Sequence, residues 1–151
     1  MERPPQVTVR RVSWSDAGAA LREIRFAVFV REQHVPEDLE WDGMDEKCLH
    51  VLAETSAGEA VGTARLLPDA HIGRMAVLPA WRQRGVGGML LVELMAAARE
   101  RGQHAVELSA QTHAIGFYRR FGFEVFGGEY MDAGIPHRMM RCSPVRPPPP
   151  G

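Results

Sequence analysis

The stretch from Ile72 to Leu91 constrains the fold of this sequence most, because a strand-like segment, a basic glycine-rich turn and a helix follow one another there. A short apolar run is stopped by Pro79, and apolar residues then recur at helical spacing from about Gln83 to Arg101. The first backbone N–H groups of a helix have no intrahelical partner and lie at the positive end of the helix dipole. We therefore expect this turn to bind an anion.

The residues of the turn indicate a phosphorylated ligand. Gly85 and Gly87 would leave the backbone amides open to a phosphate, and Arg82 and Arg84 add positive charge. The turn has neither the Gly-x-x-x-x-Gly-Lys-Ser/Thr pattern of nucleotide-hydrolysing loops nor the Gly-x-Gly-x-x-Gly pattern of dinucleotide-binding folds. We therefore expect neither of these two phosphate sites.

Two motifs resemble those of a known family. The pattern Arg82-x-x-Gly85-x-Gly87 is similar to the pyrophosphate-binding signature of the GNAT acetyltransferases, which bind acetyl-coenzyme A there. The segment from Phe117 to Phe123 resembles the second GNAT signature, in which a helix ends in Phe-Tyr-x-x-x-Gly-Phe. Residues 28–33, 40–45 and 132–137 further resemble the ElaA-like and YjcF-like members. The chain is thereby identified as a GNAT member over residues 7–142.

The order of elements predicts an α/β fold with a single mixed sheet and helices on both faces. The resemblance implies the GNAT fold, whose mostly antiparallel sheet is splayed at the cofactor cleft. Ser13 or Ser15 is expected to cap the first helix and Thr112 the last, and Gly127-Gly128 to start a mobile or tightly turned connection. The predicted strands cover 7–12, 49–54, 60–67, 71–77, 105–110, 123–126 and 137–142, and the predicted helices 17–33, 83–101 and 112–120.

The length and composition of the chain fit one soluble domain. With 151 residues the chain can bury a proper core, and we expect a domain over 1–143 followed by a disordered proline-rich tail over 144–151. A net charge of −1 argues against a nucleic-acid partner. No apolar run is long enough to span a membrane, and Cys48 and Cys142 are interpreted as reduced thiols in a cytoplasmic protein. The resemblance also makes a homodimer possible.

The resemblance implies where acetyl-CoA binds. Main-chain groups of the strand would bond the amides of the pantetheine arm like an added strand, and the turn would hold the pyrophosphate. The family often has asparagine where Gln111 stands, so its contact to the cofactor is an extrapolation. The alternative for the strand is an ordinary, fully paired core strand. The expected cofactor-binding residues are Met75, Ala76, Val77, Arg82, Gln83, Arg84, Gly85, Val86, Gly87, Gly88 and Gln111.

Tyr118 and His137 are the expected catalytic residues. Tyr118 would lie at the end of the helix that lines the gap, where its phenol could protonate the departing thiolate. The alternative is a packing tyrosine. An amine acceptor must lose a proton before it attacks a thioester, and an imidazole suits that transfer near neutral pH. The alternative for His137 is a buried structural histidine.

Three carboxylates are the rivals of His137 as the base. Glu32 lies before an acidic segment over 37–46, and Glu40 and Asp42 lie within it. The resemblance implies that the first helix and this segment form the acceptor side of the cleft. These three residues and Asp45 are therefore expected to select a cationic or amino substrate. The alternative is an ordinary solvated loop.

The histidines show no His-x-x-x-His pattern and the acidic segment lacks the spacing of a calcium loop, so no metal is expected. A Gly-x-Ser-x-Gly hydrolase elbow is also absent from the sequence. The sequence therefore predicts an acetyl-CoA-dependent N-acetyltransferase that acts on a primary amine in a ternary complex. The acceptor is expected to be a small molecule, with a peptide or protein amine as the second choice. A coenzyme A-binding sensor without turnover is the alternative from another class.

Overall fold

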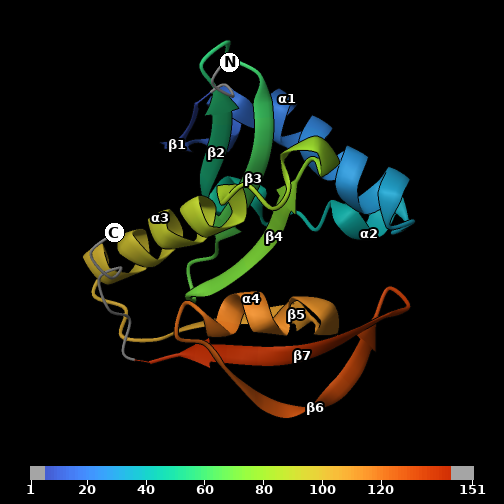
Figure 1. Ribbon diagram of the computed structural model, residues 1–151, viewed down its shortest axis with the longest axis vertical. Coiled ribbons are helices and arrows are strands. Elements are labelled where there is room, and N and C mark those ends of the chain that lie inside the picture. The colour runs from blue at the N-terminus through green and yellow to red at the C-terminus, as the bar shows by residue number, and fades with distance from the viewer. Residues whose placement is uncertain (1–5, 144–151) are drawn as a thin grey trace.

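The computed structural model describes residues 6–143, which form one seven-stranded sheet in the order β1-β2-β3-β4-β5-β7-β6 (Figure 1). Neighbouring strands are antiparallel except β4 and β5, which are parallel. This confirms the predicted mixed, mostly antiparallel sheet. The predicted tail over 144–151 lies outside the described residues. The strands are β1 (Val7–Val12), β2 (Leu49–Thr55), β3 (Ala60–Leu66), β4 (His71–Val77), β5 (Val106–Gln111), β6 (Glu124–Asp132) and β7 (Ile135–Cys142).

Helices cover both faces of the sheet, as predicted (Figure 1). Successive residues of a strand point to opposite faces, so Leu52 packs under α1 while its neighbours Val51 and Ala53 pack with α3. The short helix α4 joins the α3 side of the core through partly buried aromatic rings. The helical segments are α1 (Trp14–Arg25), η1 (Phe26–Glu32), α2 (Glu37–Glu40), η2 (Asp45–Lys47), η3 (Pro79–Trp81), α3 (Val86–Glu100), η4 (Thr112–Ala114) and α4 (Ile115–Arg119).

The sheet splays between β4 and β5, which confirms the opening expected from the family. The two strands pair only at their beginnings, His71 with Glu107 and Ile72 with Leu108. Beyond this point β4 pairs with β3 alone and β5 with β7 alone. A bulge in β4 bends the strand away, and Arg74 there has a φ of +47°. Two strand edges therefore diverge around a gap.

The helices differ from the prediction at their ends. Helix α1 begins at Trp14, and Ser13 caps it by accepting a hydrogen bond from the Asp16 N–H at 3.1 Å. Its predicted continuation is a π-helix, η1, rather than α-helix. Helix α3 begins at Val86 and not at Gln83, because Gln83 and Gly85 both adopt left-handed conformations with φ of +62° and +84°.

Two other local predictions are wrong. Gly127 and Gly128 do not start a connection; they lie inside β6 as an irregularity of the β6–β7 ladder, and the hairpin turns at Ala133-Gly134 instead. Thr112 does not cap α4 with its side chain, since a 3₁₀ turn precedes that helix. Within residues 6–143, no helix is long and apolar enough to cross a membrane.

Candidate active site

A cavity of about 890 Å³ occupies the gap between β4 and β5. Its walls come from the end of η1, from β4 and β5, from α4 and from the β6–β7 hairpin. The lining brings together nine of the residues predicted from the sequence: Glu32, Glu40, Met75, Ala76, Val77, Arg82, Gln111, Tyr118 and His137. The remaining predicted residues do not line it, namely Gln83, Arg84, Gly85, Val86, Gly87, Gly88, Asp42 and Asp45.

The backbone of β4 offers an open edge to this cavity. Among the described residues, the segment from Gly73 to Val77 has a strand partner only on its β3 side. The side chain of Ala76 is buried against α1, so it is the main chain that faces the gap. An amide-bearing ligand can hydrogen-bond such an edge in the manner of an added strand. The geometry therefore fits the pantetheine arm of a coenzyme A thioester.

The turn before α3 is built to expose backbone amides. Gly85 occupies the N-cap position with a φ of +84°, and in the described chain no side chain caps this helix end. A Cβ added at Gly85 would meet nothing within 4 Å, which leaves the approach open. At Gly88 a Cβ would lie 2.9 Å from Cζ of Phe121, so this glycine also permits close packing of α3 on the Phe121 ring, in the turn that follows α4. The sequence analysis explained the glycines by ligand access alone.

Arg82 precedes this turn in the sequence and is already bonded within the chain. Its Nε donates to the main-chain oxygen of Val77 at 2.9 Å. Its Nη1 and Nη2 donate to the two carboxylate oxygens of Glu32 at 2.7 and 2.6 Å. These bonds lower the pKa of Glu32. Arg84 behaves differently, with its guanidinium stacked 5.0 Å from the centre of the Trp81 ring.

The Tyr118 hydroxyl has a sulfur atom as its partner. It donates to Sδ of Met75 across 3.8 Å, which is a weak hydrogen bond. Burial raises the pKa of Tyr118 to about 12, so the phenol is neutral at pH 7. The ring packs edge-on against Phe117 and Phe123 at centroid distances of 5.0 and 6.0 Å. Tyr118 is therefore a positioned, neutral hydrogen-bond donor on the cavity wall.

The orientation of His137 determines which of its nitrogens is basic. Nδ1 lies 2.7 Å from the main-chain oxygen of Ile135, and because a carbonyl only accepts, Nδ1 carries the proton. In the neutral ring Nε2 then keeps its lone pair. The ring is 8% exposed and stacks on Tyr130 at a centroid distance of 5.9 Å. The sequence analysis did not single out Tyr130, because an aromatic residue in a strand carries no specific signal.

Gln111 connects the two sides of the cavity. Its side-chain nitrogen donates to the side-chain oxygen of Gln33 at 2.9 Å. Gln33 follows η1 directly, whereas Gln111 ends β5. Together with the Glu32–Arg82 pair, this bond holds the end of η1 at the gap.

A closed ring of six charged side chains that alternate in sign lies beside the site: Arg25, Glu40, Arg74, Asp42, Arg65 and Asp45. Arg25, which is 1% exposed, binds Glu40 at 2.7 Å and Asp45 at 2.6 Å. Arg65 binds Asp45 at 2.8 Å and also contacts Asp42. Arg74 closes the ring at 3.3 Å from Glu40 and 3.4 Å from Asp42. This charge ring ties the segment 37–46 to α1, β3 and β4.

The charge ring changes the interpretation of Glu40 and Asp42. Both carboxylates are paired with arginines of the chain itself, and hydrogen bonds from Arg65 hold the pKa of Asp42 well below its usual range. Asp45 is likewise paired, with Arg25 and Arg65. A cationic substrate would have to break these ion pairs, which argues against substrate binding by any of the three carboxylates. Their arginine partners come from distant parts of the sequence, which explains why the sequence analysis missed them.

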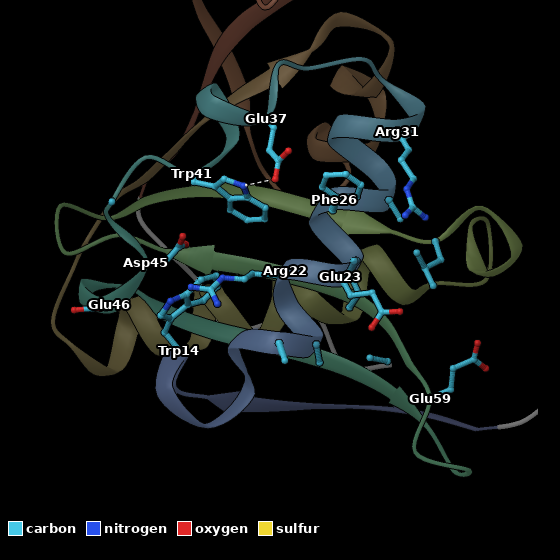
Figure 2. Close-up of a pocket in the computed structure, with 17 residues that line it drawn as sticks. Trp14, Arg22, Glu23, Phe26, Arg31, Glu37, Trp41, Asp45, Glu46 and Glu59 are labelled. Atoms are coloured by element: carbon cyan, nitrogen blue, oxygen red, sulfur yellow. Dashed lines mark hydrogen bonds between the residues drawn. The ribbon is translucent and has the colours of Figure 1, made fainter.

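A second cavity, of about 1090 Å³, lies along the outer surface of α1 (Figure 2). Its aromatic lining is already covered by arginines: Arg22 stacks 4.9 Å from the centre of the Trp14 ring, and Arg31 stacks 5.0 Å from that of Phe26. Trp41 donates to Glu37 at 3.4 Å, the dashed bond in Figure 2. Of the predicted site residues, Asp45 alone lines this cavity.

Comparisons with known proteins agree with this geometry. The family model for the acetyltransferase (GNAT) domain matches residues 13–144. The uncharacterized N-acetyltransferase YjcF of Bacillus subtilis is 36% identical over 121 residues, which are 78% of this chain and 86% of YjcF. An acyl-CoA N-acyltransferase of Pseudomonas aeruginosa has a TM-score of 0.82 at 30% identity, covering 91% of this chain and 100% of its own. Escherichia coli ElaA has a TM-score of 0.81 at 30% identity, with the same coverages. The chain therefore belongs to the GNAT family of acyl-CoA-dependent acyltransferases, in the branch that includes ElaA and YjcF.

Proposed function

We propose that this protein transfers the acetyl group of acetyl-CoA to a small primary amine by direct attack within a ternary complex. The proposal rests on one observation above all: the open edge of β4, the Tyr118 hydroxyl and the His137 imidazole line the same cavity. Its volume, about 890 Å³, is in the usual range for sites that take small molecules. A peptide amine is the second choice of acceptor.

The donor side of the site is formed by β4 and the turn before α3. Acetyl-CoA supplies an acyl group activated as a thioester. Main-chain groups from Met75 to Val77 would hold its pantetheine arm along the strand edge, and Arg82 with the amides of residues 84–88 would hold its phosphates. Holding both reactants in place converts a bimolecular reaction into an effectively unimolecular one, which supplies much of the rate.

Tyr118 would act on the sulfur of the leaving group. Its hydroxyl already donates to the thioether sulfur of Met75, which indicates that a sulfur atom can occupy this position. A phenol with a pKa of about 12 is a weak acid, so it acts mainly by donating a hydrogen bond as negative charge grows on sulfur. The proton needed for the free thiol is available from the acceptor amine.

His137 would take the proton of that amine. Nδ1 donates to Ile135, and the free lone pair on Nε2 makes this atom the base, directly or through one water. Among the rival carboxylates, Glu40 and Asp42 are held in the charge ring and Glu32 is held by Arg82. His137 is the candidate whose basic atom is not already used in an ion pair.

The test is release of free coenzyme A thiol from acetyl-CoA, with and without a panel of small amines, polyamines, amino sugars and lysine peptides. Release that depends on one class of small amine is the expected result. Release with lysine peptides alone would replace the small molecule by a peptide acceptor. Tight binding of acetyl-CoA without release for any amine would contradict the proposed transfer to these acceptors.

A further inference from the structure

We propose that Glu32 is an internal competitor for the coenzyme, because its carboxylate occupies the arginine that the phosphates of the coenzyme would use. This inference rests on the proposed function, in which Arg82 binds those phosphates. It adds a control on coenzyme affinity that is built into the acceptor side of the cavity.

The contacts of Arg82 engage three of its five N–H donors, so neither two-point face of the guanidinium is fully free. Both terminal nitrogens of its guanidinium donate to Glu32, at 2.7 and 2.6 Å, and Nε donates to Val77. This two-point contact is the same arrangement with which an arginine binds a phosphate. Glu32 therefore occupies, within the chain, the place of the negatively charged ligand.

Two anions cannot share this face of Arg82. A phosphate that approached while Glu32 remained in place would meet a neutralised guanidinium and a carboxylate of like charge. A phosphate of the coenzyme can therefore take this face of Arg82 only when Glu32 leaves it. The pair is partly solvated, with side chains 38% and 39% exposed, so the bond is replaceable by a ligand with more negative charge.

The segment that carries Glu32 has an unusual backbone conformation. It is the last residue of η1, a π-helical segment held by bonds such as Gln33 N–H to the Val28 oxygen at 3.0 Å. His34, two residues after the end of η1, has a φ of +60°, which is uncommon for a residue other than glycine. Such π-helical turns are uncommon and occur frequently at functional sites, and a return to α-helix would shift Glu32 around the helix axis.

The competition predicts how a charge-neutral variant binds. Glu32→Gln keeps the size of the side chain and removes its charge, so acetyl-CoA should bind about three- to fivefold more tightly, the effect of one partly exposed ion pair. Acetylpantetheine carries no phosphate, so its affinity should not change. Asp38→Asn, which removes one charge from an exposed position on α2, is the matched control and should leave both affinities unchanged.

The experiment is isothermal titration of acetyl-CoA and of acetylpantetheine into the wild type, Glu32→Gln, Arg82→Gln and the double variant. When Arg82 is already replaced by glutamine, Glu32→Gln should no longer change the affinity for acetyl-CoA. An unchanged or weaker affinity of Glu32→Gln for acetyl-CoA would overturn the competition while leaving the proposed function in place, and so would equal tightening of both ligands. If acetyl-CoA bound to none of the proteins, the proposed function would fail and the competition with it.

Discussion

Arg25 donates from Nη1 to Oδ1 of Asp45 at 2.6 Å, with both side chains almost fully buried, and this bond joins α1 to the acidic segment of the sequence. Arg25 is also a member of the charge ring through Glu40. Removing one partner of a buried ion pair leaves the other charge without compensation. Arg25→Met should therefore lower the free energy of unfolding by about 3–5 kcal/mol, measured by urea denaturation at pH 7.

Arg22→Met is the control for this loss. Arg22 is on the same helix, but it is exposed and stacks on Trp14 at the surface. Its replacement should cost less than about 1 kcal/mol. Similar losses in the two variants would mean that the charge ring does not hold the fold together.

Tyr118→Phe should slow transfer by about 100-fold and leave the acetyl-CoA affinity unchanged, because only the donor to the sulfur is lost. The variant retains the ring that packs against Phe117 and Phe123. The measurement is thiol release under saturating acceptor, together with titration of acetyl-CoA. Unchanged turnover would remove Tyr118 from the mechanism.

His137→Ala should lower kcat by about 100-fold without weakening acetyl-CoA binding, since the base acts on the acceptor. Added imidazole should restore part of the rate, because the variant has room for a free ring where the buried side chain was. A histidine that served only to pack the hairpin would give a less stable protein with no response to imidazole.

His50 makes stability depend on pH. It is 1% exposed, its Nε2 donates to the main-chain oxygen of Asp45 at 2.8 Å, and burial lowers its pKa below the ordinary value of 6.5. The unfolded chain then binds a proton more readily than the folded one. The free energy of unfolding should fall as the pH drops below about 6.5, by at most about 1.4 kcal/mol per pH unit from this group.

Urea denaturation between pH 5 and 7 in the His50→Gln variant tests this dependence, because the slope due to His50 should disappear. His104→Gln, at an exposed position, should keep the slope of the wild type. If the His50→Gln slope matched that of the wild type, other groups would be responsible for the dependence.

Much of the fold could be predicted because the spacing of apolar residues within each short segment indicates whether that segment forms a helix or a strand. The order of strands and helices, the hairpin between β2 and β3 and the Ser13 cap all follow from short-range signals. The π-helical segment could not be foreseen, since Phe26–Glu32 continues the apolar pattern of α1. Gly127 and Gly128 were misinterpreted because glycine marks a bulge within a strand as well as a turn between strands.

The site was predictable to the extent that its residues lie in short motifs. Strand β4, Arg82 and Tyr118 were found this way, and all three contribute to one cavity. The partners of the acidic residues were not predictable, because Arg25, Arg65 and Arg74 meet them only through the tertiary fold. A carboxylate in an acidic segment gives no sign in the sequence of whether it faces solvent or an arginine.

The charge ring also bears on how new acceptor preferences could evolve in this protein. A mutation in the segment 37–46 that breaks an ion pair of the ring lowers the stability of the fold, so most such variants would be lost to selection. The hairpin residues Asp132, Ala133 and Ile135 also line the cavity, and none of them belongs to the ring. A substitution at the hairpin can therefore alter the acceptor site without breaking the ring, while the acidic segment is expected to change only together with its arginines.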